Sequence, residues 1–236
     1  MTQLGEITID PQFNGPPTSG NGGYCAGLLA TFEINPIRVR LKAPVPLETP
    51  LAITRTEHGL AARHGGTEVM SAITTSRLAT PPRPPSFEIA STGRNQFIDE
   101  ADHGLPTCFV CGPHRKPGDG LCLFTGPVEG FPGVADVWRA EDKFCDEDGF
   151  LRPEIIWAAL DCPSAFAIND AENLMLLGEI AVDIHARPKA GEDLIVTGWA
   201  GQTDGRKHTA GAALHRADGT LLAQSDTLWI ELKQNP

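Results

Sequence analysis

Apolar residues recur at every second position in two separate stretches of the chain, Ile37–Thr54 and Ile180–Thr197. The two stretches align without a gap over eighteen positions at a constant offset of 180 − 37 = 143 residues, so that Val39 matches Val182. A period of two is that of a β-strand with one buried face. A match at a fixed offset indicates an internal duplication, so we interpret the chain as two related halves with a possible site between them.

The pattern around each copy predicts the same order of elements in both halves: a strand, a buried helix, then three or four antiparallel strands. Residues 23–34 are small or apolar throughout and predict a helix buried on most sides. Residues 151–170 predict the second helix, which begins near Pro153 and is kinked by Pro163. The order is not strand–helix–strand repeated, so we do not expect a parallel, doubly wound sheet.

A proline-rich segment separates the halves. Pro81, Pro82, Pro84 and Pro85 are incompatible with a helix or a central strand. We therefore predict an N-terminal unit at 1–80, a connector at 81–107 and a C-terminal unit at 108–236, sizes that suit single domains. After an opening at CFVCG, residues 119–128 and 133–141 read as strands of the second unit.

Composition narrows the class of partner. The net charge of −11 and the pI near 5.0 argue against nucleic acid, because neutralising phosphates requires clustered Lys and Arg. No apolar run approaches the ~20 residues that span a bilayer, and the opening MTQLGEITID lacks the features of a signal peptide. Six cysteines without an export signal are best interpreted as reduced thiols. We expect a soluble, cytoplasmic protein with no nucleic-acid or membrane partner.

Three segments occur in an order that resembles a known superfamily. Cys108–Leu121 carries a CxxCG…GL opening, and Leu151–Asp161 carries a helix pattern that ends in an acid; both resemble PaaI-like hotdog thioesterases. Residues 205–224 resemble the C-terminal strands of bacterial type II acyl-CoA thioesterases. The resemblance to the hotdog-fold acyl-CoA thioesterase superfamily covers most of the second half, and the repeat extends it to the first. It implies an α+β tandem double hotdog, two units each with an antiparallel sheet wrapped around a central helix.

The resemblance also implies where the chemistry lies. Hotdog thioesterases hold a thioester at the junction of two units. The start of one unit's helix polarises the carbonyl, and a carboxylate from the other unit's helix attacks it or activates water. A helix start suits this task because its unpaired N–H groups and partial positive charge stabilise a developing oxyanion.

The two helices of this chain divide these features between them. Asn21-Gly22-Gly23 falls on the family's His-Gly-Gly, but Ala30 stands at the acid position nine residues after Asn21. In the second helix Arg152-Pro153-Glu154 takes the His-Gly-Gly place, and Asp161 stands at the acid position. Pro153 has no N–H to donate, and Glu154 adds a negative charge. We therefore predict one working site, with the Gly22–Gly23 helix start facing Asp161, and one inactive site.

These comparisons define the candidate residues. We assign catalytic roles to Asp161, Asn21, Gly22 and Gly23, whereas Asp161 could instead bond the backbone or end the helix, and the glycines could form an ordinary turn. The family's supporting Thr and Gln positions fall near Gly178–Glu179 and on Thr227, so direct attack and general-base catalysis both stay open. The residues to which we assign substrate binding are Tyr24, Ser164, Arg206, Lys207 and Thr227.

Two of these assignments have plain alternatives. Arg206 and Lys207 fall in a turn between strands, where they could meet coenzyme A phosphates or form a solvated basic turn. Ser164 could help hold a catalytic water or cap the kink at Pro163.

The cysteines offer a second possible chemistry. Cys108-x-x-Cys111, with His114 and Cys122 nearby, could bind zinc, but one CxxC without a second pair is a poor signal. We favour small buried residues of the hotdog opening, and packing for Cys162. We therefore expect no metal and no cofactor beyond the coenzyme A of the substrate.

The sequence thus predicts a thioesterase-like hydrolase that acts on an acyl-CoA or another acyl thioester, as a monomer or a homodimer of double hotdogs. The alternative is a non-catalytic protein that binds acyl-CoA or lipid, which the lost Thr and Gln partners favour. The identity of the acyl group stays open.

Overall fold

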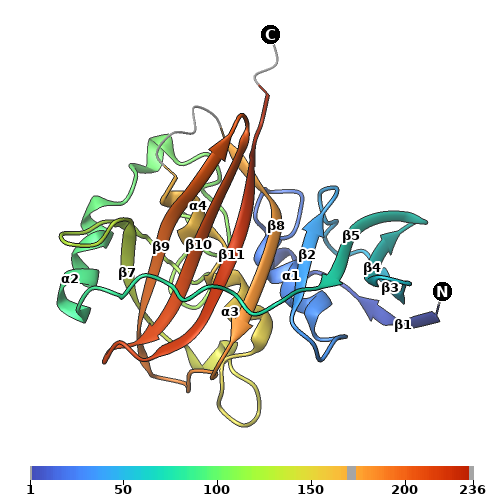
Figure 1. Cartoon of the computed structure of the whole chain (residues 1–236), viewed down its shortest axis with the longest axis horizontal. Helices are drawn as coiled ribbons and strands as arrows, with labels where there is room; N and C mark the ends of the chain where they lie inside the picture. Colours follow the sequence, from blue (N-terminus) through green and yellow to red (C-terminus); the bar gives the residue numbers. More distant parts are fainter. Residues whose placement is uncertain (1, 169–173, 234–236) are drawn as a thin grey trace.

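The computed structural model describes residues 2–168 and 174–233, which build one eleven-stranded antiparallel sheet with short helices packed against it (Figure 1). The helices are α1 (Gly22–Ala30), α2 (Phe87–Thr92), α3 (Pro153–Ala159) and α4 (Cys162–Phe166), with 3₁₀ turns at Pro11–Phe13, Gly93–Gln96, Glu100–Asp102 and Asp142–Phe144. The strands are β1 (Thr2–Ile7), β2 (Ile37–Leu41), β3 (Leu51–Arg55), β4 (Gly59–His64), β5 (Thr67–Thr74), β6 (Gly126–Pro127), β7 (Val134–Arg139), β8 (Met175–Ile184), β9 (Asp193–Asp204), β10 (Lys207–Arg216) and β11 (Leu221–Glu231).

The sheet has the same strand order on both sides of its centre. Read outward, one side runs β2-β5-β4-β3-β1 and the other β8-β11-β10-β9-β7, with β6 added at the edge. The centre is the antiparallel pair β2–β8, in which Arg38 lies opposite Ala181. The offset of the repeat equates these two residues, since 181 − 38 = 143. Equivalent strands of the two halves therefore pair at the centre of the sheet, and the repeat corresponds to an approximate two-fold arrangement of strands.

The alternating apolar residues of the repeat point into a shared core. Ile37 and Val39 in β2 are buried, as is Ile180 in β8. The same main cluster contains the apolar face of β3 and residues from both halves. The predicted strand period is confirmed, and both halves contribute to the main core.

Helices α1 and α3 pack directly against each other beside the middle of the sheet (Figure 1). On α1, Cys25, Ala26 and Leu29 are fully buried, as the apolar composition predicted. The helices approach closely because Gly27 faces α3: a Cβ there would lie 2.6 Å from Glu154 Cα. Within the described residues, none of the helices has the length and hydropathy that crossing a bilayer would require.

The second predicted helix is interrupted. α3 ends at Ala159 and α4 begins at Cys162, with Leu160 and Asp161 between them. Pro163 has no N–H for the Ala159 carbonyl, so the kink expected from the sequence becomes a break. The last two positions of the predicted helix, 169 and 170, lie outside the described residues.

Two other predictions differ from the structure. Of the strand expected at 119–128, only Gly126–Pro127 pairs in the sheet. The Leu121 and Leu123 N–H groups instead bond the Phe109 and Val110 carbonyls, and Cys122 has a left-handed φ of 51° that interrupts an extended strand.

The connector also contains a helix that was not predicted. α2 begins after Ser86, whose hydroxyl accepts a hydrogen bond from Ile89 N, and Ala90 packs on β7 and β9. The prolines themselves lie outside regular elements, as expected. The unit boundaries at 80 and 108 stay a prediction.

Candidate active site

Asp161 lies in the break between α3 and α4 and faces the start of α1. Its Oδ2 accepts hydrogen bonds from Gly23 N at 2.9 Å and from Asn21 Nδ2 at 2.8 Å. Asn21 also caps α1, because its Oδ1 accepts a hydrogen bond from Tyr24 N at 2.9 Å. The structure thus brings an acid from one half to the helix start of the other, the juxtaposition that the sequence predicted.

The two glycines have different positions at this helix start. The Gly23 N–H donates to Asp161 itself, whereas the sequence predicted that the Gly22–Gly23 helix start would face Asp161 and polarise the substrate carbonyl. The Gly22 N–H lies in the first turn, where no intrahelical acceptor exists. Gly23 requires glycine, because a Cβ there would lie 2.6 Å from the backbone oxygen of Trp157, whereas a Cβ on Gly22 would meet the movable end of the Leu177 side chain at 2.8 Å.

The environment of Asp161 changes its acidity. Only 2% of the residue is exposed, and burial raises its pKa to about 7 against the opposing hydrogen bond from Gly23. Its Oδ1 is buried and has no hydrogen-bond partner among the described residues. The carboxyl is therefore held through one oxygen, while the other is available as an acceptor.

A buried hydroxyl network holds the turn that carries Asp161. Ser164 Oγ donates a hydrogen bond to Asp161 O at 2.7 Å and accepts one from Trp229 Nε1 at 2.8 Å. Thr227 Oγ1 lies 3.0 Å from the same Ser164 oxygen. Ser164 and Thr227 thus support the turn of Asp161, which agrees with the capping alternative for Ser164. Trp229 was not identified from the sequence.

A cavity of about 410 Å³ opens beside this acid, bordered by Asn21, Gly22 and Asp161. Lys42, which was also missed, follows the repeat strand and borders the cavity. The rest of the wall is mostly apolar or small, with the polar Thr18 and Ser19, and comes from both halves of the chain. Its apolar part is made of Leu41, Ala43, Pro44, Val45, Leu105, Cys108, Cys162, Met175, Leu176, Leu177, Trp229, Ile230 and Leu232. Such a site suits a largely apolar ligand with one polar reacting group.

The other predicted substrate-binding residues have different surroundings. Tyr24 is buried, and its ring stacks on Phe13 with centroids 4.0 Å apart, so it packs in the core. Burial raises the pKa of Tyr24. Arg206 Nη1 donates a hydrogen bond to Glu231 O at 2.7 Å, in the segment whose Ile230 and Leu232 border the cavity. Lys207 begins β10 and pairs with Ile230.

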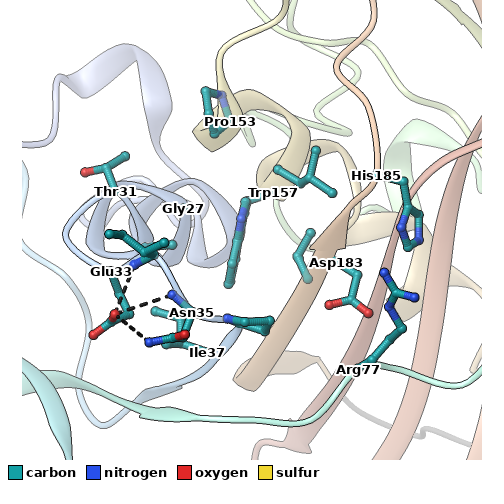
Figure 2. Close-up of a pocket in the computed structure, with 15 residues that line it drawn as sticks. Gly27, Thr31, Glu33, Asn35, Ile37, Arg77, Pro153, Trp157, Asp183 and His185 are labelled. Carbon is teal, nitrogen blue, oxygen red and sulfur yellow. Dashed lines mark hydrogen bonds between the residues drawn. The ribbon is translucent and has the colours of Figure 1, made fainter.

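A second cavity, of about 570 Å³, also lies between the two halves, at the place that the approximate two-fold arrangement equates with the first cavity (Figure 2). It is bordered by Pro153, which the helix alignment equates with Gly22 (153 − 22 = 131), and by Ala30, which it equates with Asp161 (161 − 30 = 131). Figure 2 shows Pro153 and Trp157 on α3 lining it. The two-fold arrangement thus extends to the cavities, but this one has neither the acid nor the N–H at those positions.

No protein-family model matches the chain, and no curated protein matches it. Three solved structures are similar over nearly all of both chains. A tesB protein from Mycobacterium avium subsp. paratuberculosis has 16% sequence identity and a TM-score of 0.61, over 97% of this chain and 92% of that one. A protein from Thermobifida fusca, described as a putative thioesterase II, has 16% identity and a TM-score of 0.60, over 97% of this chain and 93% of that one. A hot dog fold protein of unknown function from Alicyclobacillus acidocaldarius has 13% identity and a TM-score of 0.61, over 98% of this chain and 93% of that one. At these identities the likeness shows the architecture, and the chain therefore has the hotdog fold that its sequence motifs indicated.

Proposed function

We propose that the chain hydrolyses an acyl thioester in the 410 Å³ cavity, with Asp161 at the reacting centre. The observation that carries the proposal is the contact between Asp161 and the start of α1, which leaves one buried carboxylate oxygen unpartnered beside the cavity. Buried carboxyls without full partners are costly and mark functional sites.

The site lies between two tandem hotdog units in this proposal. The mirrored strand order, the self-opposed pair Arg38 and Ala181, and the packing of α1 on α3 support that arrangement. Pairing two units places one helix start opposite the other unit's acid, which neither unit can do alone.

The residues then have separate tasks. Asn21 and Gly23 fix Oδ2 of Asp161, while Oδ1 removes a proton from water or attacks the thioester carbonyl carbon. The Gly22 N–H donates to the carbonyl oxygen as negative charge develops there. In the general-base route the activated water adds to the carbonyl carbon, the C–S bond breaks, and the proton taken up by Asp161 passes to the leaving thiolate, which gives a carboxylic acid and a thiol. In the direct-attack route C–S cleavage expels the thiolate and leaves an acyl–Asp161 anhydride; water then hydrolyses the anhydride to the carboxylic acid and supplies the proton for the thiolate.

Coenzyme A is the thiol that we propose for the substrate. The apolar wall around Leu41, Leu177 and Trp229 suits an acyl chain. Lys42 borders the cavity, with its ammonium paired to Glu68, and Arg206 lies near the cavity wall. We propose that the phosphates of the coenzyme bind these cations and compete with Glu68 for Lys42.

The Asp161→Asn variant tests the proposal. Asn keeps an oxygen that accepts from Gly23 N–H but provides no base or carboxylate nucleophile, so we expect turnover of a panel of acyl-CoAs to fall at least about a hundredfold. Substrate affinity, measured by calorimetry, should change little. Asp183→Asn is the matched control, since Asp183 borders the second cavity and its variant should retain activity.

One observation favours a non-catalytic acyl-CoA-binding protein as the second candidate. The Gly23 N–H is already bound to Asp161, which leaves fewer donors for an oxyanion. Tight binding of acyl-CoAs by the unmodified chain with no release of thiol would support this candidate and contradict hydrolysis.

A further inference from the structure

Three cysteines from distant parts of the sequence meet beside the cavity. The Sγ atoms of Cys108, Cys111 and Cys162 all lie within 4.8 Å of one another, and all three residues are buried. The Cys108 and Cys162 sulfurs are 3.7 Å apart. The sequence showed only the CxxC pair, because Cys162 joins it through the break between α3 and α4.

The loop that carries the pair holds the sulfurs of Cys108 and Cys111 close together. One side-chain donor also reaches this cluster: Asn21 Nδ2 donates a long hydrogen bond of 4.0 Å to the Cys108 sulfur. The loop closes through a bond from Gly112 N to Cys108 O at 2.9 Å. Gly112 is required there, since a Cβ would lie 2.6 Å from backbone atoms of Cys108. Thiols that merely fill a core have apolar neighbours, whereas a side-chain amide donor at a sulfur is the kind of outer contact that a metal thiolate accepts.

The spacing of the sulfurs also suits a metal. A tetrahedral zinc ion with Zn–S bonds of about 2.3 Å places its sulfur ligands about 3.8 Å apart. The observed separation of 3.7 Å between Cys108 and Cys162 matches this value, and the limit of 4.8 Å for the trio requires only small movements. The CxxC spacing lets one loop supply two ligands.

We propose that Cys108, Cys111 and Cys162 bind one zinc ion, with the fourth coordination position open to the cavity. Cys108 and Cys162 border the cavity, which provides a path for entry. Three protein ligands and an open position are the arrangement of reactive rather than purely structural zinc sites. This site goes beyond the proposed hydrolysis and does not depend on it.

Metal binding to the reduced, chelator-treated chain tests the proposal without any assay of activity. Competition between the protein and a chromogenic zinc chelator should show one ion per chain. Cobalt(II), used as a spectroscopic substitute, should give thiolate-to-metal charge-transfer bands of the intensity that three sulfur ligands produce.

Cys111→Ser is the decisive variant, because Cys111 belongs to the trio while Asn21, Gly22 and Asp161 stay unchanged. We expect its zinc affinity to fall on the order of a hundredfold, since it loses one of three thiolates. Cys25→Ser is the matched control: Cys25 is equally buried but lies outside the trio, so its zinc affinity should stay unchanged.

Equal zinc affinities for Cys111→Ser and the unmodified chain would overturn the proposal, as would a folded, reduced chain that binds no stoichiometric zinc. Circular dichroism and thermal unfolding show whether each variant is folded. If Cys111→Ser does not fold, the cobalt spectrum of the unmodified chain decides: a spectrum without thiolate charge-transfer bands excludes the site.

Discussion

At the scale of single residues, the surroundings of Asp161 combine the start of α1 with a hydroxyl network that comes from distant strands. The glycine pair and Asp161 are recognisable because each sits at a fixed distance along its own helix pattern. The hydroxyl network is not, because Ser164 meets Thr227 and Trp229 across a separation of more than 60 residues. Lys42 was missed for a similar reason: only the fold brings the end of β2 to the cavity.

Asn21 has two tasks that substitutions can separate. Asn21→Ala removes both the cap on Tyr24 N and the bond to Asp161, whereas Asn21→Ser keeps a capping hydroxyl but is too short to replace the second bond. We expect the alanine variant to be less stable than the serine variant by about 1 kcal/mol, the usual contribution of a cap. Urea unfolding measures this difference, and thioester turnover should fall in both. Equal stabilities would contradict the capping role.

At the scale of elements, the period of apolar residues predicted the strands and the first helix better than it predicted the segments between them. Strands of the repeat and the helix at 22–30 follow their patterns closely. The segment 121–125 does not, because its backbone bonds pair with the CxxC loop and Cys122 takes a left-handed conformation. Such pairing depends on tertiary contacts that no local pattern encodes.

The contact between α1 and α3 reverses the usual effect of a glycine-to-alanine change. In an isolated helix this change stabilises by about 1 kcal/mol. At Gly27 the new Cβ would lie 2.6 Å from Glu154 Cα and 2.9 Å from Trp157 Cβ, so we expect Gly27→Ala to destabilise by about 1–3 kcal/mol. Chemical denaturation measures the change. A stability gain would show that the two helices can separate without cost.

At the scale of the whole molecule, the internal repeat predicted the matching strand order on the two sides of the sheet. The join between β2 and β8 and the main core combine residues of both halves. Alignment of the repeat indicated that the halves are related, but an offset cannot show how much surface they share. That depends on packing, which places α1 against α3.

Because the main core is shared, we expect residues 1–80 alone to lack a cooperative unfolding transition. The isolated fragment would leave the edge of β2 that pairs with β8 without a partner strand and would expose the face of α1 that packs on α3. Thermal unfolding followed by circular dichroism tests this, with the complete chain as the control. A sharp transition in the fragment would mean that its own apolar contacts suffice.

The meeting of Arg38 with Ala181 at the seam has a further consequence. An assembly of two identical chains would carry every mutation twice, once in each cavity. In this single chain the two positions are encoded separately, so alanine at position 30 coexists with aspartate at position 161. A change beside one cavity therefore leaves the residue beside the other cavity unaltered.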